Sequence, residues 1–468
     1  MKKINIFWAL SPIVLLITLL TINVIVFSDD ATSGANQIAL IFSAMFAATI
    51  ALNFGFSWKN LQEGIVKSIG SAMGAIIILL IIGSLTGTWL IGGIVPAMIY
   101  YGIQIIDPSI FLFASCIVCA IVASSIGSSW TTVATIGVAL ITIGKAIGSP
   151  VEMTAGAIIS GSYFGDKISP LSDTTNLASA MSEVDLIKHI KYMLFTTVPS
   201  IIISLALFLI LGFKFSGNID SNDINQIILT IDENFYIGPE LFITPLIMVF
   251  LIFRKVPAFP TLFIGTVLGA ITAILFQEKA ISNISESNIL TGIIYYKIIL
   301  QAMFGEMNVG GDLLSSNGMY GMLNTVWLII CAMIFGGIME KAGFLKIIAK
   351  AIMTKAKSHA ALVTSTAGSC MFFNLTASDQ YLAIVVPGRM YKGIYKKRKL
   401  APENLSRTLE DTGTVTSVLI PWNTCGAYQA SILGVATIAY LPFCFFNIIS
   451  PFMTLLYAYA KIKIKKIS

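Results

Sequence analysis

Gly165-Asp-Lys-Ile-Ser-Pro-Leu-Ser-Asp-Thr-Thr-Asn176 is a polar stretch inside otherwise hydrophobic sequence. It holds two carboxylates, Asp166 and Asp173, and a proline, Pro170. At membrane depth, a broken and charged segment of this kind is tolerated only where it lines a cavity or binds a ligand, because lipid offers its polar groups no hydrogen-bond partners. The fold therefore depends on whether this stretch lies in a membrane.

The composition answers that question. Hydrophobic residues make up 56% of the 468 residues and charged residues 11%, and the mean hydropathy is +0.87. Apolar runs of roughly 17 to 25 residues, each long enough to cross about 30 Å of hydrocarbon as a helix, recur along the chain. The polar stretches between them are short and leave no soluble domain. The sequence therefore predicts an all-α polytopic membrane protein in a lipid bilayer.

Lysine and arginine residues are distributed unevenly among the predicted loops. One topology places most of them on the same side of the membrane and the acidic loops on the other. By the positive-inside rule, the basic side is cytoplasmic, and both the N- and the C-terminus lie there. The basic stretches are residues 2–3, 59–67, 188–191, 254–255, 341–357, 389–407 and 461–466. The net charge of +6 thus reflects topology and not a surface for nucleic acid.

This topology requires two apolar segments that enter and leave the membrane on the same side. We expect them to be re-entrant hairpins at residues 107–145 and 358–399, each with a polar tip. Basic residues flank the second hairpin at both ends, as a hairpin that opens to the cytoplasm requires. The first has almost no positive flank, so we expect it to open outward.

A shift of 251 positions relates the two hairpins. It places Ser128 on Asp379 and Pro170 on Pro421. Over residues 82–190, apolar and polar residues alternate in the same order as in the residues 251 positions later. Because equivalent loops differ in positive charge, the two halves should lie in opposite orientations, which makes an inverted repeat of about ten transmembrane helices plus the two hairpins. The predicted units are a first repeat at 1–213 with a broken helix at 152–182, an external linker at 214–237, and a second repeat at 238–468 with a broken helix at 403–434.

Broken helices and hairpin tips of opposite repeats tend to meet near the bilayer midplane, where half-helix ends and unwound carbonyls bind ions. The residues at these positions are nearly all oxygen donors, which suit a hard monovalent cation, whereas soft metals prefer histidine or thiolate ligands. The predicted ion-binding and coupling residues are Asp173, Asp379, Asp166, Asp411, Ser172, Thr174, Thr175, Asn176, Asn374, Ser378, Gln380, Asn423, Thr424, Ser128 and Ser129. Na⁺ itself is expected at Asp173, Thr174, Asn176, Asp379 and Asn423.

The carboxylates suggest how exchange could work. In a cavity of low dielectric constant a carboxylate binds a proton more tightly than in water, and a nearby cation opposes that protonation. One site can then hold either Na⁺ or H⁺, and competition between them is the simplest exchange mechanism.

Several of these residues also have a structural interpretation. Asp173 and Asp379 could cap the helices that follow them. Asp166 could form an internal ion pair with the adjacent Lys167 that steadies the break.

The same alternatives exist elsewhere in the site. Asp411 could serve in coupling or could pair with Arg407. Ser128 and Ser129 could bond the backbone of the hairpin tip and bind no ion.

Long motifs carry a family resemblance that covers nearly the whole chain. The stretches are Tyr163-Phe-Gly-Asp-Lys-Ile-Ser-Pro-Leu-Ser-Asp-Thr-Thr-Asn-Leu-Ala178, Ala377-Ser-Asp-Gln-Tyr-Leu-Ala383, Leu405-Ser-Arg-Thr-Leu-Glu-Asp-Thr-Gly-Thr414 and Pro421-Trp-Asn-Thr-Cys-Gly426. They resemble the conserved blocks of the NhaC-type sodium/proton antiporter family. The resemblance implies a secondary transporter of the bacterial inner membrane that exchanges Na⁺ for H⁺ and uses no cofactor. The same family includes exchangers of malate and lactate, so a small carboxylate is the alternative substrate. A homodimer is one option for the oligomeric state.

Two other classes of protein deserve comparison. Tyr163-Phe-Gly-Asp166 and a second membrane aspartate faintly resemble intramembrane aspartyl proteases, which need two carboxylates that share a proton. Two broken repeats with a full second set of polar ligands are needed for alternating access and are superfluous for proteolysis. A channel would differ by the absence of coupling between the two ions. We therefore predict a transporter and not an enzyme.

Overall fold

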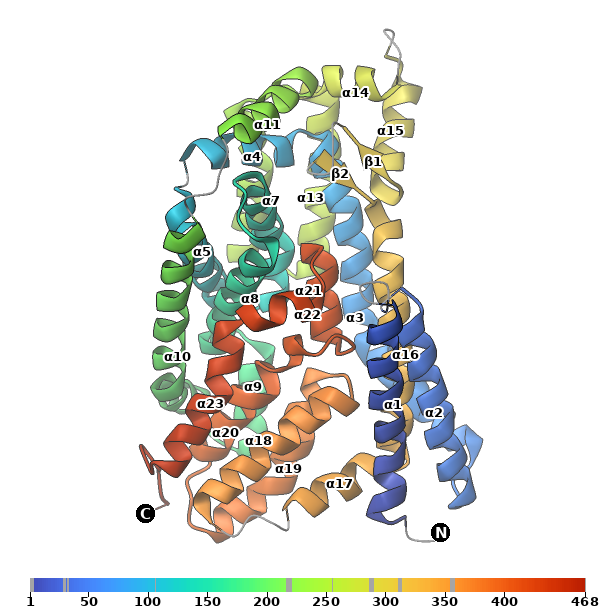
Figure 1. Ribbon diagram of the computed structural model, residues 1–468, viewed down its shortest axis with the longest axis vertical. Coiled ribbons are helices and arrows are strands. Elements are labelled where there is room, and N and C mark those ends of the chain that lie inside the picture. The colour runs from blue at the N-terminus through green and yellow to red at the C-terminus, as the bar shows by residue number, and fades with distance from the viewer. Residues whose placement is uncertain are drawn as a thin grey trace.

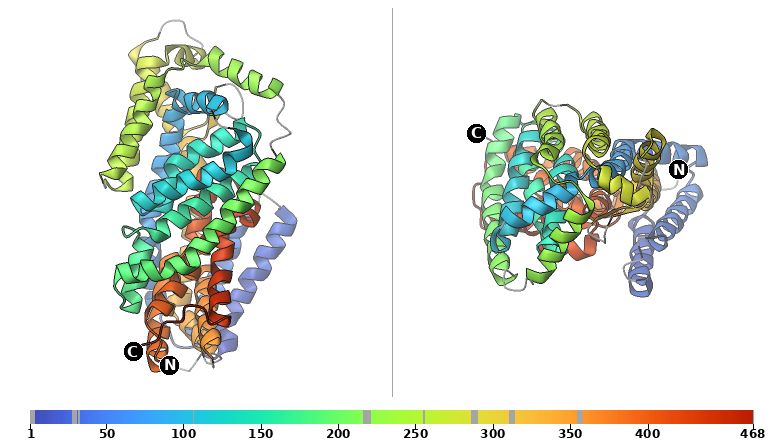
Figure 2. Two further views of the ribbon diagram at one scale, coloured as in Figure 1. Left: turned by 90° about the vertical axis from the view of Figure 1, so that its left-hand side faces the viewer. Right: turned by 90° about the horizontal axis from the view of Figure 1, so that it is seen from above.

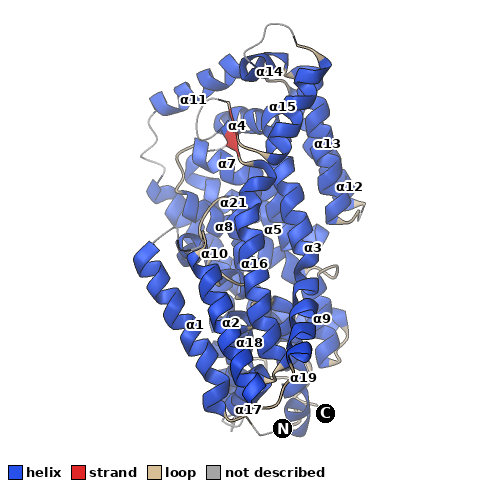
Figure 3. Ribbon diagram, turned by 90° about the vertical axis from the view of Figure 1, so that its right-hand side faces the viewer, coloured by secondary structure: helices blue, strands red, loops and turns tan. Residues whose placement is uncertain are grey.

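The computed structural model describes residues 4–27, 31, 33–105, 107–215, 221–254, 256–285, 290–309, 314–353 and 358–467. Nearly all of them are helical (Figure 3). Among these residues, eight helices are long and apolar enough to cross a membrane, or up to ten if each of two bent helix pairs counts as one span. The predicted class, an all-α polytopic membrane protein, is therefore confirmed. Five basic residues of the predicted topology lie outside the described residues: Lys2, Lys3, Lys255, Lys355 and Lys357.

Two long helices, α3 (Trp58–Ile91) and α16 (Gly318–Lys341), pack against each other along much of their length. Glycines permit the close approach: a Cβ at Gly64 would collide with the backbone at Gly337, and one at Gly83 with the backbone at Gly318. The order of these contacts makes the two helices antiparallel. Helix α2 (Ala35–Asn53) packs on α16, and α1 (Ile6–Phe27) covers α2 (Figure 1).

The first predicted hairpin contains α5, a tight tip and a second arm that starts with α6. Gly127 adopts a left-handed backbone with φ of 75°, and Ser128 caps α6 by accepting a hydrogen bond from the Thr131 amide. A proline-led break then divides the following span into α8 and α9. The bounds are α5 (Phe111–Ile126), α6 (Ser129–Thr132), a π-helical turn (Val133–Gly137), α7 (Val138–Ala146), α8 (Val151–Ile168), α9 (Asp173–Ser182) and α10 (Leu186–Phe215).

The second predicted hairpin and break follow the same plan. Ser378 has a left-handed backbone with φ of 57°, and Asp379 caps α19 by accepting from the Leu382 amide. The next span starts as a helix, passes through a π-helical turn and breaks before α21. The bounds are α18 (His359–Thr376), α19 (Gln380–Lys397), α20 (Glu403–Leu409), the π-helical turn (Glu410–Thr414), a 3₁₀ turn (Ser417–Leu419), α21 (Thr424–Leu433), α22 (Thr437–Tyr440) and α23 (Phe445–Tyr459).

The remaining elements include one further candidate span, α13, and shorter helices and strands. The two short strands pair antiparallel, with Met307 opposite Ser316. Of the predicted linker 214–237, residues 216–220 lie outside the described residues and 221–234 form α11. The bounds are α4 (Ile94–Ile105), α11 (Ser221–Asn234), α12 (Ile243–Phe253), α13 (Ala258–Phe276), α14 (Glu278–Ser285), α15 (Gly292–Phe304), β1 (Met307–Asn308), β2 (Ser315–Ser316) and α17 (Phe344–Met353).

Small residues let the first hairpin pack tightly on the first broken span. A Cβ at Gly161 of α8 would meet the Cys116 carbonyl of α5, and one at Gly165 would meet the Ala120 carbonyl. The long helices of this side run obliquely past one another (Figure 2). Both chain ends lie at the end of the molecule that holds α17, α18 and α19, whereas α11 and α14 lie at the opposite end (Figure 1).

Candidate functional site

A cavity of about 300 Å³ lies where the two hairpin tips meet the first break. Seven predicted site residues line it: Ser128, Asp166, Asp173, Thr174, Asp379, Gln380 and Thr424. Its opposite wall comes from α3. Three of the lining side chains are carboxylates, and none of the described lining residues is a lysine or an arginine. A cavity with this lining attracts cations and repels anions.

Asp166 links the cavity to the first hairpin tip. Its Oδ2 accepts hydrogen bonds from the Ser129 amide at 3.0 Å and from Ser129 Oγ at 2.8 Å. Its Oδ1 is buried and has no hydrogen-bond partner among the described residues. One oxygen of this carboxylate therefore fixes the hairpin tip, and the other is free to bind an ion or a proton. The pairing of Asp166 with Lys167 proposed from the sequence is wrong, because Lys167 pairs elsewhere.

The first break, Ser169–Ser172, is closed by its own polar side chains. Asn176 Nδ2 donates to the carbonyls of Pro170 at 2.9 Å and Ser172 at 2.8 Å. Ser172 Oγ caps α9 by accepting from the Thr175 amide at 3.4 Å. Thr175 Oγ1 donates to the Lys167 carbonyl at 2.9 Å. Of residues 169–176, Asp173 and Thr174 at the start of α9 line the cavity.

The second hairpin tip is joined to the second break by its backbone and by two asparagines. The Thr424 amide donates to the Ser378 carbonyl at 2.9 Å. Asn423 Nδ2 donates to the Asn374 carbonyl at 3.0 Å, and Asn374 Nδ2 donates to the Gly413 carbonyl at 2.7 Å. These amides hold the tip in place. Asn374, Asn423 and Asn176 thus lie outside the cavity lining, with their amide groups bonded to backbone.

Two further residues complete the second side of the cavity. Asp379 is nearly buried and caps α19 with Oδ1, at 2.9 Å from the Leu382 amide. Gln380 Oε1 accepts from Ser417 Oγ at 3.4 Å. Ser378 Oγ is buried and has no partner among the described residues. Asp379 therefore acts as a cap and also lies at the cavity, so the two interpretations given above do not exclude each other.

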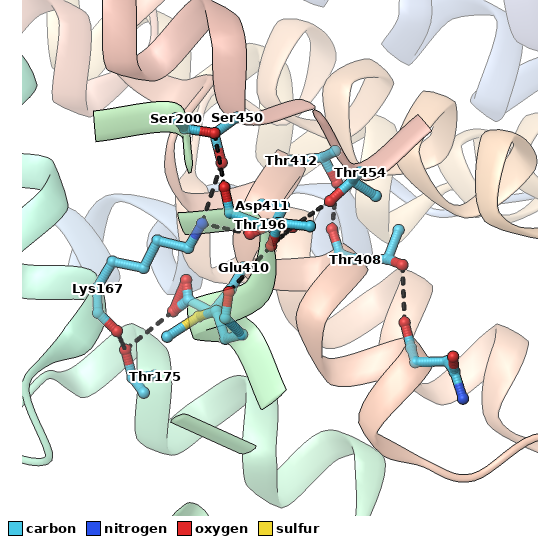
Figure 4. A network of polar contacts seen from close by, with 12 residues as sticks. Lys167, Thr175, Thr196, Ser200, Thr408, Glu410, Asp411, Thr412, Ser450 and Thr454 are labelled. Atoms are coloured by element: carbon cyan, nitrogen blue, oxygen red, sulfur yellow. Dashed lines mark hydrogen bonds and ion pairs between the residues drawn. The ribbon is translucent and has the colours of Figure 1, made fainter. Parts of the chain in front are cut away.

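Asp411 lies in a separate buried network (Figure 4). It forms an ion pair with Lys167, and both side chains are completely buried. Thr196 Oγ1 of α10 donates to Asp411 Oδ2 at 2.7 Å, and Thr454 of α23 donates to the same oxygen. Lys167 Nζ also donates to Ser450 Oγ at 3.0 Å. The network joins the end of α8 to the π-helical turn, and Asp411 is not among the residues that line the cavity.

The sequence-based alternative for Asp411, a pair with Arg407, is therefore wrong. Arg407 is fully buried, and its Cζ lies 4.7 Å from the ring centroid of Tyr192. The neighbouring Glu410 accepts from Thr175 Oγ1 at 3.4 Å, which adds a second link between the two broken spans.

Comparison with known proteins shows to which family the chain belongs. Residues 161–462 match the sequence model of the Na⁺/H⁺ antiporter family. The chain belongs to this family. It is 38% identical over 424 residues to the malate-2H⁺/Na⁺-lactate antiporter of Bacillus subtilis, which covers 90% of this chain and 89% of that protein. It is 37% identical over 426 residues to the Na⁺/H⁺ antiporter NhaC of the same organism, which covers 91% of this chain and 92% of that protein. It is also 35% identical over 455 residues to the arginine/ornithine antiporter ArcD of Halobacterium salinarum, which covers 96% of this chain and 90% of that protein.

These relatives confirm the resemblance to the NhaC-type antiporters and place the chain among transporters, not enzymes. Sequence reasoning missed several residues around the antiporter's cavity. Ser71 and Ala72 of α3 line it, and their small side chains in an apolar helix give only a weak signal. Trp130 lines it too and stacks on Tyr428 with ring centroids 4.1 Å apart. This stack joins the first hairpin to α21, and no sequence motif points to it.

Proposed function

We propose that this antiporter exchanges Na⁺ for H⁺ across the bacterial inner membrane by alternating access. One observation carries the proposal: three carboxylates from three helices line one cavity that has no described lysine or arginine in its wall. Such a lining suits a monovalent cation and a proton that compete for the same oxygens. Na⁺ would bind at Asp173, Asp379 and the free Oδ1 of Asp166, assisted by Thr174. Asn176 and Asn423, also predicted as ligands, would act by holding the breaks.

Backbone features that recur along the chain support this mechanism. Four backbone features recur at a spacing of 251 residues, as the sequence shift requires. The left-handed residues Gly127 and Ser378 match, and so do the caps Ser128 and Asp379, the caps Ser172 and Asn423, and the left-handed residues Glu183 and Gly434. We infer that residues 1–213 and 238–468 are structural repeats of opposite orientation, each with a re-entrant hairpin and a broken span.

The direction of coupling follows from the competition. A proton that enters from outside would occupy the carboxylates after Na⁺ has left, and the cavity would reopen inward without a bound cation. Proton release inside would then let Na⁺ bind again. The hairpin tips and breaks face α3 across the cavity, so the step between states is a movement of these elements against α3 and α16. The basic loops support cytoplasmic N- and C-termini.

The test uses purified protein in proteoliposomes with an internal pH dye. A Na⁺ gradient should move protons in the wild type. Asp173→Asn and Asp379→Asn should abolish this flux and leave folding intact. Ser172 and not Asp173 caps α9, and asparagine can replace Asp379 as the cap of α19. Asp185→Asn, which changes an exposed carboxylate that caps α10, serves as the matched control and should keep the flux. Undiminished Na⁺-dependent flux in either cavity variant would remove that residue from the mechanism.

Exchange of a small organic acid is the second candidate. It is favoured by the 38% identity to the malate-2H⁺/Na⁺-lactate antiporter, and the cavity of about 300 Å³ exceeds the roughly 30 Å³ that one water molecule occupies. Because the described lining has no basic side chain, a bound Na⁺ would have to provide the positive charge for the carboxylate. Uptake is compared with Na⁺ alone, with Na⁺ plus malate or lactate, and with arginine. Flux that requires the acid would overturn plain Na⁺/H⁺ exchange, and flux that requires arginine would replace both candidates.

A further inference from the structure

A second pocket, of about 490 Å³, lies at the end of the molecule that carries both chain termini. One wall is the first part of α10, with Lys188, Lys191, Tyr192 and Phe195. The other wall is the tail after α23, with residues 463–465. Four of the seven lining residues are lysines, and they come from segments far apart in the sequence. The carboxylate cavity shares none of these residues.

The tail that brings two of these lysines to the pocket is held in place. The Ala401 amide donates to the Lys465 carbonyl at 3.0 Å, and Asn404 Nδ2 donates to the same carbonyl at 2.7 Å. The Tyr192 hydroxyl lies within hydrogen-bond distance of two acceptors, the Lys463 carbonyl and Asn404 Oδ1, and can donate its one hydrogen to either. Lys463 has a left-handed backbone with φ of 51°, which a residue with a side chain seldom adopts. These contacts thus fix the position of the tail against α10 and α20.

The charge in the pocket is only partly balanced. Lys465 Nζ forms an ion pair with Glu403 Oε1 at 2.6 Å. Lys188, Lys191 and Lys463 have no carboxylate partner among the described residues. Lys463 Nζ lies over the Phe195 ring at 4.8 Å from its centroid, so that side chain leans into the pocket. Arg407 adds a buried positive charge behind the Tyr192 ring. The pocket therefore has a net positive charge, which favours binding of an anion.

The surface beside the pocket indicates which anion would fit. Lys188 and Lys191 share one stripe of α10 with three apolar residues that lie further along the helix: Phe195, Val198 and Ile202. All five side chains are exposed at the surface of the protein. In a membrane-spanning helix this exposed apolar surface faces the acyl chains, and the lysines lie at the headgroup level. The stripe thus offers positive charge at one end and an apolar track along the rest.

We propose that this pocket binds the phosphate group of an anionic phospholipid, with an acyl chain along Phe195, Val198 and Ile202. Lys188, Lys191 and Lys463 contact the phosphate, and Lys465 remains with Glu403. A membrane-bound phosphate at this place would tie the start of α10 to the tail. A basic pocket between helices is a recurring site for acidic lipid headgroups. Free inorganic phosphate shares the headgroup chemistry but would make no use of the apolar track.

The test measures lipid binding by the full-length protein. The thermal unfolding midpoint in neutral detergent is followed during titration with short-chain phosphatidylglycerol, with phosphatidylcholine, and with inorganic phosphate. The probe variant is Lys188→Gln/Lys191→Gln/Lys463→Gln. The matched control is Lys346→Gln/Lys350→Gln/Lys397→Gln, which removes three exposed lysines from α17 and α19. Lipid retained in native mass spectrometry gives a second readout.

Phosphatidylglycerol should stabilise the wild type and the control, and phosphatidylcholine and phosphate should not. The probe variant should bind phosphatidylglycerol roughly 10- to 100-fold more weakly, because each lysine near the headgroups contributes to attraction of an acidic lipid. High salt should weaken binding to the wild type. An equal loss of affinity for phosphatidylglycerol in the probe and control variants would refute binding at this pocket, since it would show that the overall charge of the protein attracts the lipid. Equal stabilisation by inorganic phosphate would refute the proposal that the ligand is a lipid. If the triple variant does not fold, Lys191→Gln alone should still weaken binding several-fold, and an unchanged affinity would refute the site.

Discussion

Removal of Asp411 and removal of Lys167 should destabilise the antiporter far more in sum than removal of both residues together. Both side chains of this ion pair are completely buried. In Asp411→Leu, the Lys167 ammonium keeps one hydrogen-bond partner among the described residues, Ser450 Oγ at 3.0 Å, and it lies 5.5 Å from the centroid of the Phe446 ring. A buried charge that loses its counter-ion costs about 3–5 kcal/mol. The reverse variant, Lys167→Met, should cost a similar amount, because it leaves the carboxylate without its cation.

The double variant Lys167→Met/Asp411→Leu should lose much less stability than the two single variants in sum. An apolar pair that replaces a buried ion pair is often neutral. Thr196 Oγ1 can donate to the Met193 carbonyl at 3.0 Å instead, so two hydroxyls lose a partner: Thr454, which donates to Asp411, and Ser450, which accepts from Lys167. An unsatisfied hydroxyl costs about 1–3 kcal/mol. The coupling energy between the two positions should therefore reach roughly 4 kcal/mol.

The assay is a double-mutant cycle on equilibrium unfolding in detergent, and a matched pair is available in the same chain. Lys341 and Glu63 form an ion pair at 3.4 Å, but their side chains are 40% and 55% exposed. The same cycle on this pair should give about 0–1 kcal/mol. The result that would refute the reasoning is a double variant as unstable as the two single variants combined. Because Asp411 does not line the cavity, the folded double variant should retain Na⁺-driven proton flux, and loss of that flux would return Asp411 to the coupling mechanism.

Three further predictions concern other contacts. Ser378→Gly should raise the free energy of unfolding by about 1 kcal/mol, since the left-handed backbone of this position favours glycine. Gly127→Ala should lower it by more than about 1 kcal/mol, because its backbone is also left-handed and the new Cβ would lie 2.6 Å from the Leu171 backbone; thermal unfolding in detergent measures both. Gly161→Leu should cost several kcal/mol or prevent folding, because the new side chain would collide with the backbone of α5, and expression yield with size-exclusion profiles would show it. A hydrogen bond from Lys392 and its charge lower the pKa of the exposed Glu183 carboxyl. This contribution to stability is present near neutral pH and is lost as the pH falls through the lowered pKa. Lys392→Gln should therefore slightly reduce the unfolding midpoint at pH 7, and the difference from the wild type should shrink as the pH falls through that pKa.

The sequence predicts the fold class well because hydropathy and helix length depend on local composition. The polar tips and the break at 169–172 could also be located, since glycine, proline and capping residues interrupt apolar sequence there. The cavity residues Asp166, Asp173 and Asp379 were found for the same reason. These features need no knowledge of which segments meet.

The ion pairs could not be predicted, because they depend on contacts across the fold. Asp166 and Lys167 are adjacent in the sequence, but neighbouring residues in a helix point in different directions. Arg407 and Asp411 have the spacing of a helical pair, yet a π-helical turn begins between them and Asp411 turns toward Lys167, 244 residues away. Local spacing suggested the wrong partners in both cases.

Each hairpin is held in place by hydrogen bonds to a broken span that is synthesised after it. In the second hairpin, the Asn374 carbonyl accepts from the side chain of Asn423, which is synthesised 49 residues later. In the first, the Ser129 amide donates to Asp166, which is synthesised 37 residues later. At about 5–20 residues per second, translation leaves the polar tips without these partners for roughly 2 to 10 s. Unsatisfied polar groups are costly in lipid. The nascent hairpins should therefore wait in the water-filled insertion machinery or at the headgroup level until the broken span arrives, so insertion of each hairpin and of its broken span is a single event.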